Sequence, residues 1–341
     1  MESKPIILHL GDDIKWNHDL YQKLQERFEI RRSYKMDRGA FIKALKTKKF
    51  GNFVAIYRPF WNTGGEMGKW DRELISLLPN SCKISASAGA GFDWVDTKVM
   101  ADHGIVYCNA ASACTESVAD AAIWLILSTY RLFSWSSQAA RSLSVSEFVD
   151  ANRNIAAISN NPSGSTLGII GLGRIGFRVA QKAQQCFGMR IIYHDVMRMD
   201  IKKSIDAEFH SLQTMLGKAD CVLIATPFNG DQLLSQEHFR MMKRGSRLVN
   251  VARGKLLDED ALIEALESGQ LSAAGLDVHF NEPVLNPRLV KMRNVELLSH
   301  TAGASLESHI GFERLGMENI LSFFETGKAI SPVNLQMMAK F

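Results

Sequence analysis

The second half of the chain contains six short, almost uninterrupted apolar runs, and segments with helical periodicity separate one run from the next. Strands that are apolar on both faces are typical of parallel sheets that helices cover on both sides. The spacing of the runs matches right-handed strand–helix–strand units. The predicted strands are Leu167–Gly171, Arg190–His194, Cys221–Thr226, Arg247–Val251, Ala273–Val278 and Val295–Ser299. This half of the chain is therefore predicted to form a doubly wound α/β domain.

The first hundred residues show a looser version of the same alternation. The predicted strands are Pro5–Leu10, Phe53–Tyr57, Lys83–Ala88 and Ile105–Cys108, and helical patterns lie around Leu20–Phe28 and Ala40–Lys48. Because 341 residues are the usual length of two domains, a second, smaller α/β domain is predicted here. Between residues 134 and 165 the chain is rich in Ser and Asn, which suggests an exposed arm or loop.

The stretch from Arg31 to Lys49 is basic, a pattern also found in nucleic-acid-binding segments. Within it, Phe41, Ala44 and Leu45 form one apolar stripe at helical spacing, and the lysines lie off that stripe. This arrangement is typical of an amphipathic helix with a solvated basic face. The whole chain carries 40 Lys and Arg against 36 Asp and Glu, a formal net charge of only +4. We therefore expect no nucleic-acid partner.

Composition excludes further classes of protein. Hydrophobic residues make up 46% and charged residues 22% of the chain, which is ordinary for a globular protein. The five cysteines are scattered and form no C-x-x-C pair, which argues against a disulfide framework and a zinc site. The N-terminus lacks an apolar secretion signal, and the most apolar helical stretch, Val118 to Phe133, is too short to span a bilayer. We expect a cytoplasmic protein with no metal site and no membrane partner.

A glycine-rich loop, Gly171-Leu172-Gly173-Arg174-Ile175-Gly176, joins a predicted strand to the helical run Phe177–Phe187. In such a loop the first glycine permits a tight turn, the second lets the backbone approach a pyrophosphate, and the third lets helix and strand pack closely. Asp195 ends the next strand, where a carboxylate accepts hydrogen bonds from the adenosine ribose. The sequence therefore predicts a dinucleotide cofactor. Asp195 favours NAD over NADP, whose 2′-phosphate would meet a like charge that Arg198 would partly offset.

Three polar side chains follow three successive predicted strands. Arg253, Glu282 and His300 each come shortly after the carboxyl end of a strand, the edge at which open α/β sheets bind ligands. A guanidinium holds a carboxylate through two hydrogen bonds, an imidazole titrates near neutral pH, and a neighbouring carboxylate favours the protonated imidazole. Each residue alone is better interpreted as an ordinary surface charge. The three together favour a catalytic set.

With these motifs the sequence resembles the D-isomer-specific 2-hydroxyacid dehydrogenase family. The matching stretches are Gly168–Gly176, Val249–Gly254, Ala274–Pro283, Ser299–Ser305, Gly89–Asp93 and Asn109–Asp120. Within the family, the run Ala88–Trp94 and the pair Asn161-Pro162 resemble the fungal D-mandelate dehydrogenases and related 2-oxoacid reductases. The resemblance implies two Rossmann-like, doubly wound parallel-sheet domains. They are a discontinuous, flavodoxin-like substrate domain of residues 1–108 and 307–341 and an inserted NAD-binding domain of residues 109–306.

The resemblance also implies the reaction and the role of each site residue. The reaction is the reversible, NAD(P)H-dependent reduction of a 2-oxo acid to a D-2-hydroxy acid, in a cleft that closes on the substrate. His300 would be the general acid, Glu282 would orient it, and Arg253 would bind the substrate carboxylate. Backbone N–H groups of Ala90 and Gly91 would complete that grip. The implied cofactor contacts are Thr115, Gly171, Gly173, Arg174, Ile175, Gly176, Asp195, Thr226, Val251, Ala252, Asp277, His300 and Gly303.

A homodimer is implied as well, formed through an arm at about residues 134–162. In that arm, Phe148, Ile155 and Ile158 are either interface residues or local core. A function of a different class, a dinucleotide-sensing corepressor-like protein on the same fold, shares a similar triad. The end of the chain soon after its last predicted helix, with no long regulatory tail, counts against that alternative.

The substrate stays open at this point. Phe60 and Trp61 follow a predicted strand, and Trp94 lies in the predicted substrate loop. These aromatic side chains either line a pocket for a branched or aromatic 2-oxo acid such as phenylglyoxylate, or pack beneath a loop. In the second case glyoxylate or hydroxypyruvate is the expected substrate. His279 replaces the usual aromatic residue of the family and is either a packing histidine or a second imidazole near Glu282.

Overall fold

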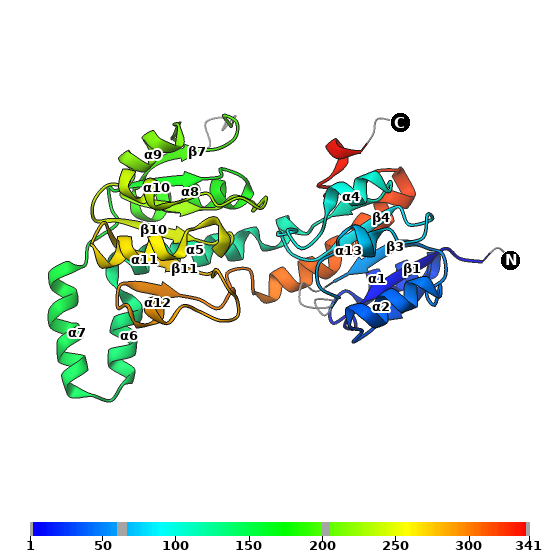
Figure 1. The fold of residues 1–341 in the computed structure, drawn as a ribbon, viewed down its shortest axis with the longest axis horizontal. Coiled ribbons are helices and arrows are strands. Elements are labelled where there is room, and N and C mark those ends of the chain that lie inside the picture. The colour runs from blue at the N-terminus through cyan, green and yellow to red at the C-terminus, as the bar shows by residue number, and fades with distance from the viewer. Residues whose placement is uncertain (1–2, 60–66, 200–204, 339–341) are drawn as a thin grey trace. The chain divides into compact units, whose positions relative to one another are not determined.

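The computed structural model describes residues 3–59, 67–199 and 205–338, and the chain divides into two compact units (Figure 1). The first unit contains Met1–Cys114 and Ala304–Phe341, and the second contains Thr115–Gly303. Each unit is built on a parallel sheet with helices, which confirms the predicted fold class. Across the described ranges, no helix combines the length and the apolar character needed to cross a membrane.

The first unit contains a five-stranded sheet with the order β2-β1-β3-β4-β5, which is the order of flavodoxin-like folds. The strands are β1 (Ile6–Leu10), β2 (Glu29–Ser33), β3 (Phe53–Arg58), β4 (Ile84–Ser87) and β5 (Val106–Cys108). The helices are α1 (His18–Arg27), α2 (Arg38–Lys46), α3 (Arg72–Ile75), α4 (Thr97–Asp102), η2 (Ala111–Cys114), α13 (Leu306–Thr326) and η4 (Leu335–Met337). The unit therefore takes its last long helix from the C-terminal segment.

Both faces of this sheet are buried, because successive strand residues point to opposite faces. Ile7 and Tyr57 pack with residues of α1 and α13 on one face. Leu8 and Ile56 pack with residues of α2, α3 and α4 on the other face. In α2 the predicted apolar stripe is buried and the lysines are exposed, which confirms the amphipathic helix predicted in the basic stretch.

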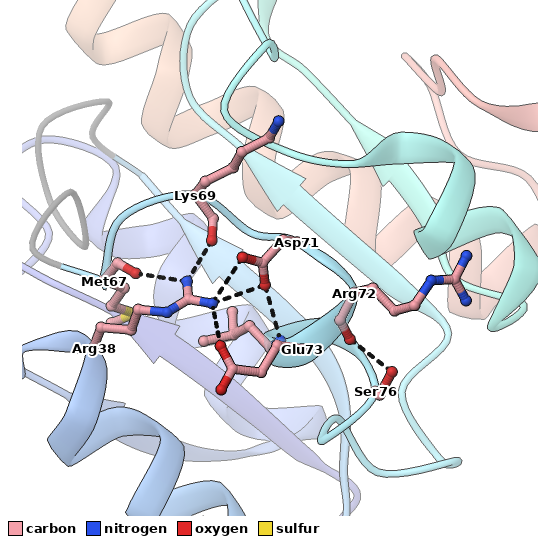
Figure 2. A network of polar contacts seen from close by, with 8 residues as sticks. Arg38, Met67, Lys69, Asp71, Arg72, Glu73 and Ser76 are labelled. Carbon is pink, nitrogen blue, oxygen red and sulfur yellow. Dashed lines mark hydrogen bonds and ion pairs between the residues drawn. The ribbon is translucent and has the colours of Figure 1, made fainter.

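Arg38, the first residue of α2, holds the segment that leads into α3 (Figure 2). Its guanidinium donates to both carboxylate oxygens of Asp71, at 2.8 and 2.9 Å, and to Glu73 Oε2 at 2.9 Å. It also donates to the carbonyl oxygens of Met67 and Lys69. The bonds from Arg38 hold the pKa of the Asp71 carboxyl below its usual value. Residues 67 to 73 are thus tied to the start of α2.

The second unit contains a seven-stranded parallel sheet with the order β12-β11-β10-β9-β6-β7-β8. The strands are β6 (Thr166–Ile170), β7 (Arg190–His194), β8 (Ala207–Phe209), β9 (Cys221–Ile224), β10 (Ser246–Asn250), β11 (Leu271–Leu276) and β12 (Val295–Leu297). The helices are α5 (Thr115–Arg131), α6 (Phe133–Arg141), α7 (Val145–Ile158), α8 (Arg174–Phe187), α9 (Leu212–Lys218), α10 (Gln236–Met241), η3 (Gly254–Leu256), α11 (Glu259–Glu267) and α12 (Pro287–Lys291). The strand order reverses between β6 and β9, which is where sheets of this kind bind their ligands.

The Ser- and Asn-rich stretch, expected to be an exposed arm or a loop, contains two helices, α6 and α7, so the loop alternative is wrong for most of it (Figure 1). Ser144 accepts a hydrogen bond from the Glu147 N–H and so caps α7. Buried Glu296 of β12 accepts the N–H of Ser134 and fixes the start of α6. A serine-rich composition by itself favours loops. Here, however, Ser144 caps α7 and Ser134 is bound by Glu296 at the start of α6.

All ten strands predicted from apolar runs are present, with limits that differ by at most a few residues. Two described strands, β2 and β8, are missing from the prediction. Each is one of the two edge strands of its sheet and pairs with a single neighbour, β1 or β7. Most residues of β2 and β8 are half-buried or exposed, so these strands lack a continuous apolar run, whereas the other two edge strands, β5 and β12, are largely buried and were predicted.

Candidate active site

The glycine-rich loop Gly171–Gly176 joins β6 to α8 and includes the first three residues of α8, at the reversal of the strand order. Gly171 has φ +92°, and a Cβ there would lie 2.8 Å from the carbonyl oxygen of Ala225. A Cβ at Gly176 would lie 2.1 Å from the carbonyl oxygen of Gly171, so glycine is needed for α8 to start this close to β6. At Gly173, the N-cap of α8, a Cβ would meet open space. The bare backbone at this helix N-terminus fits a pyrophosphate group.

Asp195 follows β7 and lies against this loop. Its Oδ2 accepts the N–H of Leu172 at 2.8 Å, and its Oδ1 accepts the N–H of Val196 at 2.7 Å. Each carboxylate oxygen has two lone pairs, so further hydrogen bonds to both oxygens are possible. The carboxylate is therefore fixed beside the loop, as expected for a residue that accepts the hydroxyl groups of an adenosine ribose.

Glu282 and His300 form the central pair of the candidate active site. His300 Nδ1 lies 2.7 Å from Glu282 Oε2, and the two side chains are 36% and 33% exposed. Glu282 Oε1 accepts the backbone N–H of His279, also at 2.7 Å. Burial alone would raise the pKa of Glu282, but the bonds from His300 and His279 outweigh burial and leave this pKa below its usual value. Because the ionised carboxylate only accepts, His300 carries a proton on Nδ1.

The backbone of His300 is left-handed, with φ +57°, a conformation that residues other than glycine adopt infrequently. Asp277 holds it there. The carbonyl oxygen of Asp277 accepts the N–H of His300 at 2.8 Å, and Asp277 Oδ1 accepts the N–H groups of Thr301 and Ala302 at 2.8 and 3.0 Å. Burial raises the pKa of Asp277 despite these two bonds. The turn after β12 is thus fastened to the end of β11.

Arg253 lies in the turn between β10 and η3, and Asn250 organises this turn. Asn250, the last residue of β10, is fully buried. Its Nδ2 donates to the carbonyl oxygen of Arg253 at 2.8 Å, and its Oδ1 accepts the N–H of Ala252 at 3.0 Å. No role was predicted for Asn250 from the sequence. The signal that identifies it is a polar residue at the end of an otherwise apolar strand, directly before a turn that carries a functional side chain.

The structure brings Arg253, Glu282 and His300 to one edge of one sheet. Strands β10, β11 and β12 are parallel neighbours, so the turns that follow them lie together, at the edge that also carries the loop Gly171–Gly176. The other predicted cofactor residues of this unit are Thr115 at the start of α5, Arg174 and Ile175 at the start of α8, Thr226 after β9, Val251 and Ala252 after β10, and Gly303 after β12.

Ala90 and Gly91 lie in the first unit, in the loop after β4. Gly89, which precedes them, has φ +83°. The Ala110 N–H donates to the carbonyl oxygen of Gly89, and Asn109 Nδ2 donates to the carbonyl oxygen of Ala90, each at 2.8 Å. These two bonds fix the orientation of the peptide groups in the loop.

The predicted pocket aromatics divide into two cases. Phe60 and Trp61 lie outside the described residues. Trp94 packs within the first unit, where the Arg58 guanidinium lies 4.2 Å from the centre of its ring and Tyr107 contacts it edge-on. One face of Trp94 is therefore covered by a buried cation, and the ring does not stand free in its loop.

Over nearly its whole length the chain is similar to known dehydrogenases and reductases. A family model, described as the NAD-binding domain of D-isomer specific 2-hydroxyacid dehydrogenases, matches residues 123–302. The holo form of Rhodotorula graminis D-mandelate dehydrogenase is 38% identical with a TM-score of 0.94, and the match covers 97% of this chain and 98% of that chain.

Two further relatives have other names. An NADPH-dependent glyoxylate/hydroxypyruvate reductase from Sinorhizobium meliloti is 30% identical with a TM-score of 0.79, over 99% of both chains. The 4-methyl-2-oxopentanoate reductase A of Aspergillus oryzae is 34% identical over 296 residues, which are 86% of this chain and 87% of that protein.

Proposed function

This chain belongs to the D-isomer-specific 2-hydroxyacid dehydrogenases, and on that premise we propose that it reduces a branched or aromatic 2-oxo acid with NADH. Its class, an oxidoreductase that reduces 2-oxo acids with NAD(P)H, follows from the family. The proposal adds the substrate, the choice of NADH and the residue roles. The observation that carries the residue roles is the 2.7 Å contact between His300 Nδ1 and Glu282 Oε2, at the sheet edge that holds the glycine loop.

We assign cofactor binding to the second unit. The backbone around Gly173 would hold the pyrophosphate, Asp195 the adenosine ribose, and Asp277 would lie near the carboxamide. The bound dinucleotide supplies the hydride that the reduction requires. Asp195 supports NADH because a ribose hydroxyl can donate to its carboxylate, whereas a 2′-phosphate is repelled by it. The relative from Sinorhizobium meliloti is NADPH-dependent, so the test below compares both cofactors.

His300 is the proposed general acid. Reduction of the 2-oxo group needs one proton at the carbonyl oxygen, and a protonated His300 would give it from Nε2 while Nδ1–H stays on Glu282. After this transfer the bond to Glu282 selects the neutral tautomer with its proton on Nδ1, so that Nε2 is the unprotonated nitrogen that takes the proton back in the reverse reaction. Acid–base catalysis of this kind contributes about 10²–10⁴-fold to a rate.

Arg253 is the proposed carboxylate-binding residue. A planar guanidinium presents paired N–H donors that match the two oxygens of a carboxylate, and this also orients the neighbouring 2-oxo group. For the first unit, we propose that the backbone N–H groups of Ala90 and Gly91 bind a carboxylate. Their small side chains, and the peptide orientation set by Asn109 and Ala110, support this role.

We propose a bulky substrate on the similarity to specific relatives. Identity to D-mandelate dehydrogenase is 38%, against 30% to the glyoxylate/hydroxypyruvate reductase. The Aspergillus oryzae relative is named for 4-methyl-2-oxopentanoate, which is also branched and apolar.

A homodimer and a cytoplasmic location complete the proposal. Apolar side chains on the α6–α7 hairpin are exposed, namely Leu143, Val145, Phe148, Val149 and Ile158, and an apolar patch of this kind is expected to be covered. We propose that a second copy of the chain covers this patch. Light scattering should then show a dimer for the natural protein and a monomer for Phe148→Asp. A monomeric natural protein would contradict the proposed homodimer. The exposed thiol of Cys186 supports a location in the reducing cytoplasm. Cell fractionation tests this location.

The deciding experiment follows the loss of NADH and NADPH absorbance with a panel of 2-oxo acids. The proposal expects NADH and phenylglyoxylate or 4-methyl-2-oxopentanoate to give the highest kcat/KM. Preference for glyoxylate or hydroxypyruvate would leave the reaction intact and overturn the bulky substrate. Binding of the dinucleotide without turnover of any acid would favour the sensor on the same fold and overturn the residue roles.

A further inference from the structure

We propose that His279 is a positioning residue that holds the three turns of the active site together. This rests on the proposed roles of Arg253, Glu282 and His300. His279 follows β11 and is only 7% exposed. Its place next to the Glu282–His300 pair allows two interpretations, a packing residue or a second acid–base group. Its contacts favour neither, because they connect it to each of the three turns.

The first contact is with Glu282. The backbone N–H of His279 donates to Glu282 Oε1 at 2.7 Å, while the other oxygen, Oε2, accepts His300 Nδ1–H at the same distance. The carboxylate is thus held at both oxygens, one by the main chain and one by the catalytic imidazole. Any shift of the His279 backbone would rotate the carboxylate that orients His300.

The second contact is with the strand that leads to His300. His279 Nε2 lies 2.7 Å from the carbonyl oxygen of Leu298, two residues before His300. A carbonyl oxygen only accepts, so Nε2 carries a proton and donates it to this bond. Because that proton is bound to the main chain, His279 is not the acid that serves the substrate. The ring instead ties the end of β12 to the end of β11, from the side chain.

The third contact is with the turn that carries Arg253. A Cβ added to Gly254 would lie 2.0 Å from the carbonyl carbon of His279 and 2.1 Å from its oxygen. The backbone of Gly254 therefore packs directly on the peptide group between His279 and Phe280. His279 is the residue at which the turns after β10, β11 and β12 meet, through two hydrogen bonds and one close packing contact.

A matched pair of variants separates positioning from packing. His279→Gln keeps a donor at about the reach of Nε2, and His279→Met has a similar length but no donor. The third variant is His279→Phe, which introduces an aromatic residue of the kind usual at this position in the family. We expect kcat with the best 2-oxo acid to fall about tenfold in the Met and Phe variants and to stay near the natural value in the Gln variant. The Kd for NADH and the melting temperature of each variant are measured in parallel.

Either of two outcomes would overturn the inference. Equal kcat in all three variants and the natural protein would show that the bond to Leu298 does not matter. Equal losses in all three, the Gln variant included, would show that ring packing and not the donor matters. In a His300→Ala background, His279→Met should change the residual rate by less than twofold, since its effect passes through His300. If the natural protein turns over no 2-oxo acid, the proposed function fails instead, which distinguishes the two failures.

Discussion

Two regions at one edge of the seven-stranded sheet have backbone conformations that are fixed in opposite ways. Between β6 and α8, order depends on the absence of side chains, because Gly171 and Gly176 leave no room for a Cβ and Gly173 leaves its backbone bare. After β10, β11 and β12, order depends on buried or half-buried polar side chains, above all Asn250 and Asp277. A cofactor loop is therefore ordered locally, whereas an acid–base site needs partners from several strands.

Removal of the catalytic imidazole should break one region and leave the other intact. We expect His300→Ala to lower kcat about 10³-fold, because the proton donor is lost, with little change in the Kd for NADH. Steady-state kinetics and quenching of protein fluorescence by NADH measure the two quantities. The control is His210→Ala. His210 pairs with Glu208 of β8, which lies at the other end of the strand order from β12. A His300→Ala enzyme with natural kcat would contradict the role of His300.

The glycine loop gives the converse experiment, with two substitutions of the same size. Gly176→Ala forces a Cβ against the carbonyl oxygen of Gly171 and should lower the free energy of unfolding by about 3 kcal/mol. Gly173→Ala meets open space, so its stability should stay within about 0.5 kcal/mol of the natural protein. Its Kd for NADH should nevertheless rise about tenfold, because the methyl group would occupy the approach of the pyrophosphate.

Urea unfolding and NADH titration of both variants check this prediction. If Gly173→Ala binds NADH as tightly as the natural protein does, the pyrophosphate does not lie on that backbone. If Gly176→Ala is as stable as the natural protein, the close approach of α8 to β6 is not the reason for that glycine.

The contrast also explains what could be predicted from the sequence. The glycine loop, Asp195 and the interior strands were predictable because their constraints act within a few residues or along one apolar run. The edge strand β2 was not, since Glu29, Arg31 and Arg32 leave it no apolar run and its only partner, β1, lies earlier in the chain. The α6–α7 hairpin was not, because the cap of Ser144 and the anchor on Glu296 appear only in three dimensions.

The candidate site divides in the same way. The turns that carry Arg253, Glu282 and His300 could be predicted from their positions after strands. The contacts that fix those turns could not. His279 and Leu298 are 19 residues apart and meet only because β11 and β12 are neighbours in the sheet. The left-handed backbone of His300 likewise depends on Asp277, which sequence reasoning connects to the cofactor and not to this turn.

Cofactor choice is a smaller effect that sharpens the role of the first region. We expect Asp195→Asn to lower the ratio of the NADPH Kd to the NADH Kd about tenfold, because the negative charge is lost while an oxygen still accepts the Leu172 N–H. Asp195→Ala removes this acceptor as well and should weaken both cofactors further. Titrations with NADH and NADPH measure the ratio. An unchanged ratio in Asp195→Asn would mean that the charge of Asp195 does not discriminate between the cofactors.

The smallest effect concerns pH and the second region. The pKa of Glu282 is lowered in the folded protein, below its usual value of 4.5, so its bonds to His300 and His279 favour the folded state at any pH above that value. This contribution is lost as the pH falls through the lowered pKa, because protonation of the Glu282 carboxylate weakens its bonds to His300 and His279. We expect the difference in unfolding free energy between the natural protein and Glu282→Gln to shrink as the pH falls below about 4.5, by less than about 1 kcal/mol for so exposed a pair. Urea unfolding at a series of pH values measures it, and a difference that shrinks already above pH 5 would mean that burial, and not the imidazole, controls this carboxylate.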